Sequence, residues 1–306
     1  MPVKAWLLIS CYLLAGQRYI HIYHITRRKV EYRLQNTHRL SILEPFHLPL
    51  GMNFIISANT DIGIVKSTNQ DSLTVKRLIT PQGPMAFALL CDGMGGLDKG
   101  EVASATVIRA FDEWIHTYLP ELCKAPLEDS VIRTQWEGII THMNQVIKAY
   151  GARQGVRLGT TVVAMLLTQN RYYILNVGDS RAYEISDGLY QITQDQTFVA
   201  REIALGNMTP EEAATDSRRN VLLQCVGASD EVYPDMFFGD VRPNAVYMLC
   251  SDGFRHEITP EEIFDKFRPE VNYDQNVMSQ NTISLIELNK YRNERDNISV
   301  ILVRTF

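Results

Sequence analysis

Stretches of alternating or continuous apolar residues predict many short strands over the last two hundred and fifty residues of the chain. Residues 85–91 are apolar throughout, so this strand is expected to be buried on both faces. Asp187 and Gly188 separate two apolar-rich stretches and predict a tight hairpin between them. The other predicted strands span residues 54–59, 73–79, 160–168, 172–177, 182–186, 189–193, 245–250 and 297–303.

Apolar residues at helical spacing predict a smaller number of helices, and Gly151 is expected to end the second of them. Thr209 and Thr259, each followed by Pro and two Glu, predict N-caps of short helices. Because helices and strands do not alternate regularly, the pattern disfavours a doubly wound parallel sheet and favours antiparallel sheets covered by helices. The longer predicted helices span residues 100–118, 130–150 and 281–291.

Residues 1–51 differ from the rest of the chain in charge. They carry seven Lys or Arg and two Glu, a net charge of +5, whereas the whole chain carries −5 and the remainder therefore −10. The apolar run at 5–16 is shorter than the ~20 residues that a membrane-spanning helix needs. We expect the native protein to start at Met52 and residues 1–51 to be an upstream extension or a poorly ordered tail. A membrane-surface segment is the open alternative.

Five aspartates stand beside predicted strands, each next to a residue that lets the backbone turn or cap. An Asp-Gly pair alone usually marks only a turn. The three glycines that follow Asp92 exceed what a turn needs and indicate a close approach of the backbone to something else. The five residues are Asp71, Asp92, Asp179, Asp252 and Asp296.

Carboxylates at several strand ends can converge on one point, where their repulsion raises their pKa values unless cations relieve it. Ligand sets made only of oxygen favour magnesium or manganese over zinc. A carboxylate that bridges two such ions is the apparatus that activates water against phosphorus. The chain has no phosphate-binding P-loop motif, no Gly-x-Ser-x-Gly elbow and no His-Glu-x-x-His motif, so no rival chemistry is indicated.

Seven motifs between about residue 53 and residue 306 resemble those of the metal-dependent (PPM, type 2C) serine/threonine protein phosphatases in their bacterial form. Each motif alone is weak, but the set in this order and spacing is specific. The motifs are Asn69-Gln70-Asp71, Asp92-Gly93-Met94-Gly95-Gly96, Gly100-Glu101-Val102-Ala103-Ser104, Gly159-Thr160-Thr161, Gly178-Asp179-Ser180-Arg181, Ser251-Asp252-Gly253 and Arg295-Asp296-Asn297-Ile298-Ser299-Val300.

The resemblance implies an α+β fold: a four-layer α-β-β-α sandwich with two antiparallel central sheets, formed by residues 52–306 as one phosphatase domain. It also implies a flap at about 195–230 that borders the site. The implied chemistry is hydrolysis of phosphoserine and phosphothreonine on proteins by a hydroxide that bridges two Mn²⁺ or Mg²⁺ ions. An opposing Hanks-type serine/threonine kinase is the implied functional partner, and neither nucleic-acid binding nor stable membrane insertion is expected.

The resemblance also implies a role for each candidate residue. Asp92 would bridge both ions, Asp252 and Asp296 would complete one of them, and the carbonyl of Gly93 would bind the other. Asp179, together with Asp252, would hold a weaker third ion. The implied catalytic residues are Asp71, Asp92, Asp252 and Asp296, of which the first supports the centre directly or through water.

Two positions depart from patterns known in the family. Lys66 stands where bacterial members usually have an Arg that grips the substrate phosphate, and Lys offers a point charge instead of a bidentate fork. A solvated lysine without such a role is the equal alternative. Met94 stands where animal members carry a His, but Met is usual in bacterial forms.

Two other functions stay open at this point. A catalytically weak or inactive member could act as a phosphoprotein-binding regulatory module, and only Lys66 favours it. The second open function is that of an enzyme that acts on a different phosphate ester. The five scattered cysteines form no zinc or disulfide pattern, which favours a reducing, cytoplasmic location.

Overall fold

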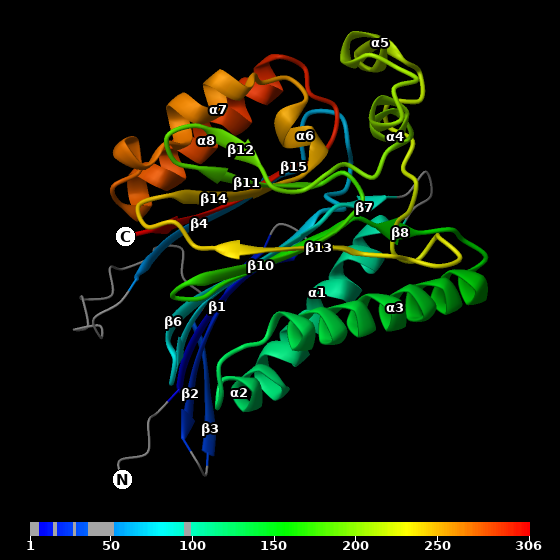
Figure 1. Ribbon diagram of the computed structural model, residues 1–306. Helices are drawn as coiled ribbons and strands as arrows, with labels where there is room; N and C mark the ends of the chain where they lie inside the picture. The colour runs from blue at the N-terminus through cyan, green and yellow to red at the C-terminus, as the bar shows by residue number, and fades with distance from the viewer. Residues whose placement is uncertain (1–5, 15–16, 27–28, 36–51, 95–98) are drawn as a thin grey trace.

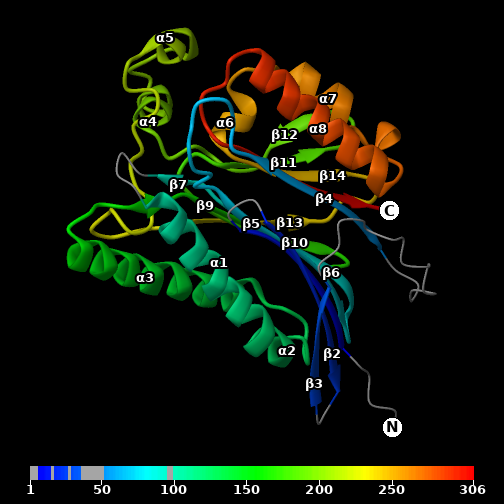
Figure 2. The ribbon, with the colours of Figure 1, turned by 180° about the vertical axis from the view of Figure 1, so that it is seen from behind.

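The computed structural model of the protein describes residues 6–14, 17–26, 29–35, 52–94 and 99–306, the first three ranges by their backbone only. Two antiparallel sheets pack face to face, with helices on the outer face of each (Figures 1 and 2). The first sheet has the strand order β13-β10-β9-β6-β5-β1-β2-β3, the second has the order β12-β11-β14-β15-β4, and β7 pairs with β8.

The strands of the first sheet are β1 (Trp6–Leu14), β2 (Gln17–Thr26), β3 (Lys29–Gln35), β5 (Ser72–Thr80), β6 (Gly83–Cys91), β9 (Val162–Leu167), β10 (Arg171–Val177) and β13 (Asp235–Asp240). Those of the second are β4 (Phe54–Asp61), β11 (Arg181–Ile185), β12 (Leu189–Gln191), β14 (Val246–Cys250) and β15 (Ile298–Thr305). The short pair is β7 (Gly93–Met94) and β8 (Gly159–Thr160).

Helices cover both outer faces, and two short helices stand apart at one end of the sandwich (Figure 1). The first sheet is covered by α1 (Gly100–Thr117), α2 (Leu119–Leu122) and α3 (Asp129–Gln154). The second is covered by α6 (Asp252–Arg255), α7 (Pro260–Phe267), the 3₁₀ turn η1 (Pro269–Val271) and α8 (Gln275–Tyr291). The two that stand apart are α4 (Phe198–Ala204) and α5 (Pro210–Thr215).

Three clusters of buried apolar side chains fill the spaces between the four layers. The cluster between α1, α3 and the first sheet includes Phe87 and Trp136. The cluster between the two sheets includes Leu90 and Ile301, and the one under α7 and α8 includes Phe254. The predicted four-layer α-β-β-α sandwich is therefore confirmed.

The second long helix extends beyond its predicted end. Helix α3 continues past Gly151 to Gln154 and ends at Gly155, whose φ of 67° is left-handed. A Cβ at residue 151 would lie 2.7 Å from the carbonyl oxygen of Val156, so the glycine there is needed for close packing. The predicted end at Gly151 is wrong because a packing glycine resembles a terminating one in sequence.

The strand β13 and the strands before Met52 were not predicted. The strands β1, β2 and β3 continue the first sheet beyond β5 in antiparallel register, Leu13 opposite Leu73 at one end of the β1–β5 pair. The proposed start at Met52 stays a prediction, and residues 1–5, 15–16, 27–28 and 36–51 of the expected extension lie outside the described residues. In the described part of the chain, no helix is long and apolar enough to cross a membrane.

Candidate metal centre

Strand register brings two of the candidate aspartates together on the first sheet. Ser72 at the start of β5 lies opposite Cys91 at the end of β6. Asp71 directly precedes the first of these residues, and Asp92 directly follows the second. Because antiparallel neighbours begin and end at the same edge, both carboxylates lie at one end of the sheet.

The second sheet contributes the other three aspartates by the same rule. Arg181 at the start of β11 lies opposite Cys250 at the end of β14. Asp179 precedes the first, Asp252 follows the second as the first residue of α6, and Asp296 precedes β15. The loops that carry these acids meet at the end of the sandwich where α6 lies (Figure 1).

The five carboxylates lie close enough to repel one another. Burial raises the pKa of Asp92 well above its usual range, and the charges of Asp71, Asp252, Asp179 and Asp296 raise it further. Burial and neighbouring carboxylates also raise the pKa values of Asp71 and Asp179 to about 7. A cluster of buried acids of this kind needs cations or protons to stabilise it.

Two oxygen atoms in this cluster are orphaned. Asp71 Oδ1 and Asp252 Oδ1 are buried and have no hydrogen-bond partner. The other oxygen of Asp71 is held by the protein, since Ser299 Oγ donates to Asp71 Oδ2 at 2.5 Å. Buried acceptors without donors, in a set of oxygen ligands only, fit hard divalent cations such as Mg²⁺ or Mn²⁺.

Among the described residues, no three His, Cys, Asp or Glu side chains form a group ready to hold a metal. Two of the carboxylates have contacts within the protein, Asp296 with Lys66 and Asp252 with His256. The carboxylates still supply oxygen donors of the kind that Mg²⁺ and Mn²⁺ prefer.

The loop before β5 is fastened to the loop before β15. Asn297 Oδ1 accepts the backbone N–H of Gln70 at 2.8 Å, and Asn297 Nδ2 donates to the carbonyl of Ile62 at 2.9 Å. A Cβ at residue 93 would lie 2.4 Å from the carbonyl oxygen of Gln70. The close approach predicted for the glycines after Asp92 is thus to the protein's own backbone; Gly95 and Gly96 lie outside the described residues.

Lys66 lies at the rim of the cluster. Its Nζ is 3.0 Å from Asp296 Oδ1, and its side chain is 40% exposed. Burial disfavours the ammonium, but the contact with Asp296 and the charges of Asp92 and Asp252 outweigh it and raise the pKa of Lys66. This lysine is therefore a charged group beside the carboxylates with one side open to solvent.

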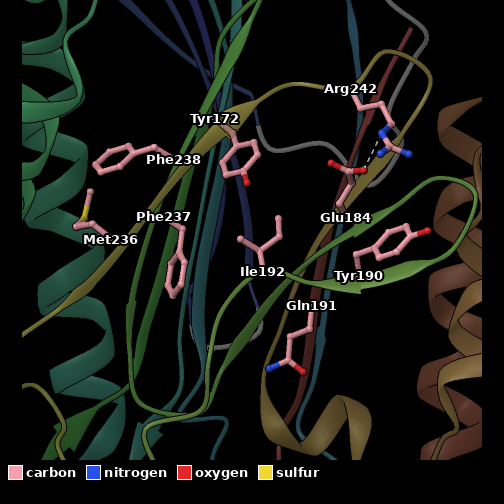
Figure 3. Close-up of a pocket in the computed structure, with 9 residues that line it drawn as sticks. All are labelled: Tyr172, Glu184, Tyr190, Gln191, Ile192, Met236, Phe237, Phe238 and Arg242. Atoms are coloured by element: carbon pink, nitrogen blue, oxygen red, sulfur yellow. Dashed lines mark ion pairs between the residues drawn. The ribbon is translucent and has the colours of Figure 1, made fainter.

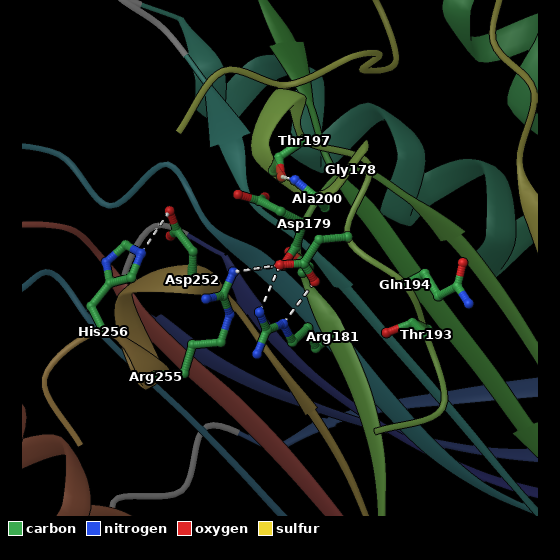
Figure 4. Close-up of polar contacts among 12 residues, drawn as sticks. Gly178, Asp179, Arg181, Thr193, Gln194, Thr197, Ala200, Asp252, Arg255 and His256 are labelled. Carbon is green, nitrogen blue, oxygen red and sulfur yellow. Dashed lines mark hydrogen bonds and ion pairs between the residues drawn. The ribbon is translucent and has the colours of Figure 1, made fainter. Parts of the chain in front are cut away.

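The flap (residues 195–230) is tied to the cluster at its base. Asp195 accepts two hydrogen bonds from Arg181, both at 2.7 Å, so Arg181 is a salt-bridge partner of the flap (Figure 4). The backbone N–H of Gly178 donates to Gln196 Oε1 at 2.8 Å. The two ends of the flap also pair with each other, since the N–H of Phe198 donates to the carbonyl of Val221 at 2.8 Å.

Sequence reasoning missed three charged residues beside the cluster. Arg255 Nη2 lies 3.4 Å from Asp195 and donates to the carbonyl of Asp179 at 3.2 Å. His256 lies between Asp252 and Glu294, as Figure 4 shows for the first of these contacts. Their spacing from the candidate aspartates could have identified two of them in the sequence: His256 follows Asp252 by four residues, and Glu294 precedes Asp296 by two.

A separate cleft opens between the edge strands β12 and β13, with a volume of about 550 Å³ (Figure 3). Aromatic residues such as Tyr172 and Phe237 line it, together with the ion pair of Glu184 and Arg242. It contains none of the candidate metal or substrate residues.

Comparisons with known proteins agree with this fold. The model of the "Protein phosphatase 2C" family matches residues 64–285. The chain therefore belongs to the protein phosphatase 2C family. A "Putative protein phosphatase 2C-type" of Streptococcus pyogenes is 32% identical over 251 residues, which are 81% of this chain and 96% of that protein. The serine/threonine phosphatase PstP of Mycobacterium tuberculosis is 32% identical over 80% of this chain, which spans 44% of PstP.

Solved structures show the same architecture. The serine/threonine phosphatase of S. agalactiae has a TM-score of 0.70 and 26% identity, and the match covers 82% of this chain and 99% of that one. The catalytic domain of PstP in complex with two manganese ions has a TM-score of 0.65 and 28% identity, over 83% of this chain and 99% of that one.

Proposed function

We propose that this protein is a metal-dependent serine/threonine protein phosphatase that hydrolyses phosphoserine and phosphothreonine on proteins. The observation that carries the proposal is the convergence of five aspartates from both sheets, two of them with buried oxygens that lack a hydrogen-bond donor. Its family relatives are named as phosphatases of this class, which supports the same conclusion.

Each candidate ligand has a proposed role in the metal centre. Asp92, Asp252, Asp296 and the Gly93 carbonyl would hold two Mn²⁺ or Mg²⁺ ions, which supply Lewis acidity and activate water for attack on phosphorus. Asp71 orients the centre from its bond with Ser299. Asp71 and Asp179 are buried, whereas the Asp296 side chain is 42% exposed, so the centre has an inner side shielded from water and an outer side open to it. Asp179, next to Arg255, is the proposed ligand of a weaker third ion.

Lys66 is proposed to bind the substrate phosphate, because it is a partly exposed cation in contact with Asp296 of the carboxylate cluster. We expect Lys66→Ala to raise KM for a phosphothreonine peptide by about tenfold, as the loss of one charged hydrogen bond. Lys66→Arg should keep KM at or below the value of the unmodified protein, since Arg binds phosphate bidentately. Steady-state kinetics at saturating Mn²⁺ test this, and an unchanged KM for Lys66→Ala would exclude the role.

The full chain tests the function directly. Phosphate release from a phosphothreonine peptide is expected with Mn²⁺ or Mg²⁺ and is expected to stop on addition of EDTA. Readdition of Mn²⁺ in excess should restore it. A folded protein that binds Mn²⁺ but releases no phosphate would favour the regulatory module instead.

The remaining proposals concern the surroundings of the enzyme. Phosphoproteins are the proposed substrates, and a kinase of the Hanks type is the proposed opposing enzyme. A cytoplasmic location is proposed because the four cysteines whose side chains are described are all free. No observation favours the inactive binding module over the enzyme.

A further inference from the structure

Two side chains beside the cluster have no role in the proposed function. His256 lies directly after α6, and its side chain is 30% exposed. Glu294 lies in the loop before β15, and its side chain is only 6% exposed. A carboxylate this buried is costly unless its oxygens are paired, so its partners indicate what it does.

Glu294 holds the backbone of one candidate metal ligand. Its Oε1 accepts the backbone N–H of Arg295 at 2.7 Å and that of Asp296 at 2.8 Å. Its Oε2 lies 3.3 Å from Nδ1 of His256. One oxygen therefore fixes the loop that carries Asp296, and the other fixes the imidazole ring.

His256 continues the chain of contacts to a second candidate ligand. Its Nε2 lies 3.6 Å from Asp252 Oδ2, and the two side chains point toward each other (Figure 4). The other oxygen, Asp252 Oδ1, has no hydrogen-bond partner. The ring thus occupies one oxygen of this carboxylate and leaves the second available.

We propose that Glu294 and His256 are positioning residues that orient Asp252 and Asp296 for the same divalent cation. The identity of the site rests on the proposed function. Glu294 sets the backbone at Asp296 directly and the carboxylate of Asp252 through the imidazole. Partners that hold metal ligands in this way commonly change metal affinity by about 10- to 100-fold when they are replaced.

The contacts act in series, which distinguishes this role from two independent structural contacts. If Glu294 sets the orientation in which His256 reaches Asp252, the two residues belong to one chain of contacts. Replacing either residue breaks that chain, and replacing both adds little to the effect on Asp252. The loss of affinity in the double variant should then be close to that of the stronger single variant rather than to the product of the two.

The test measures Mn²⁺ binding to the full chain by isothermal titration calorimetry, with melting temperatures in EDTA for each variant. We expect His256→Ala and Glu294→Gln to raise Kd for the ion held by Asp252 and Asp296 by about tenfold with little change in melting temperature. His256→Gln keeps a donor toward Asp252 and should recover part of the affinity. Phosphatase activity of these variants should rise toward normal at high Mn²⁺.

Matched controls use residues of the same kind away from the site. His142→Gln on α3 and Glu270→Gln in η1 replace exposed side chains and should leave Mn²⁺ affinity unchanged. Unchanged Kd in His256→Ala and Glu294→Gln would overturn the inference. So would a loss of affinity matched by an equal loss of stability in EDTA, since that marks a structural role.

The two proposals fail in different ways. An unmodified protein that binds Mn²⁺ but hydrolyses no phosphopeptide contradicts the proposed function, whereas the effect of His256→Ala on Kd still decides the positioning role. An active protein whose variants bind Mn²⁺ normally contradicts only the positioning role.

Discussion

Asp92→Asn is expected to lower kcat/KM for a phosphothreonine peptide by about 10³-fold or more while the protein stays folded. The proposed bridging ligand loses its charge, and metal stabilisation of the reaction is worth several kcal/mol. Asp252→Asn should cause a loss of the same order, because it removes a ligand whose Oδ1 has no other partner. Steady-state kinetics with Mn²⁺, and circular dichroism for the fold, measure both effects.

The stability of Asp92→Asn gives a second readout. Burial and neighbouring carboxylates raise the folded-state pKa of this residue above its unfolded value. Above the unfolded pKa, ionisation therefore destabilises the folded protein, and a neutral Asn removes that cost. We expect the variant to melt in EDTA at pH 7.5 no lower than the unmodified protein. Asp265→Asn, at an exposed position on α7, is the control, and near-normal activity of Asp92→Asn would contradict the proposed site.

Trp136→Ala is expected to reduce the free energy of unfolding by about 3–5 kcal/mol. Trp136 on α3 is fully buried, and its ring meets Phe111 and Trp114 edge-on with centroids 5.6 Å apart in each pair. It also meets Phe87 of β6 edge-on at 6.1 Å, so the indole joins the helical layer to the first sheet. Chemical denaturation in urea measures this change, and the whole free energy of unfolding of a protein is typically about 5–15 kcal/mol.

Trp136→Phe separates ring packing from the polar atom. The indole Nε1 of Trp136 is buried without a hydrogen-bond partner, so Phe loses volume but no hydrogen bond. We expect the Phe variant to lose less than half as much stability as the Ala variant. Equal losses in the two variants would contradict this account of the core.

The layer order and the site segments could be predicted because both depend on local signals. Continuous apolar residues identified β6, and the capping boxes at Thr209 and Thr259 marked α5 and α7. The strand β13 was missed because its sequence ends in Asp at both sides and includes Gly239, residues that are depleted in strands. Its pairing with β10 stabilises a segment whose own preference for strand is weak.

The candidate aspartates could be found from sequence, but the contacts around them could not. Each Asp follows or precedes a strand, and this position can be recognised from the sequence alone. The pairing of Glu294 with His256 joins residues 38 positions apart in two loops, and only the register of β14 and β15 brings these loops together. Likewise, the contact of Lys66 with Asp296 spans almost the whole domain.

The narrow base of the flap has a consequence for how enzymes of this design diversify. Its two ends pair through one isolated β-bridge between Thr197 and Leu222, and Gln196 Oε1 accepts the backbone N–H of Gly178 in the sandwich. Insertions or substitutions between α4 and α5, where Gly206 has a left-handed φ of 73°, are then expected to leave the carboxylate end of both sheets undisturbed. The middle of this segment can thus vary in sequence while its base, held at residues 196, 197 and 222, keeps the strand ends that carry the carboxylates in place.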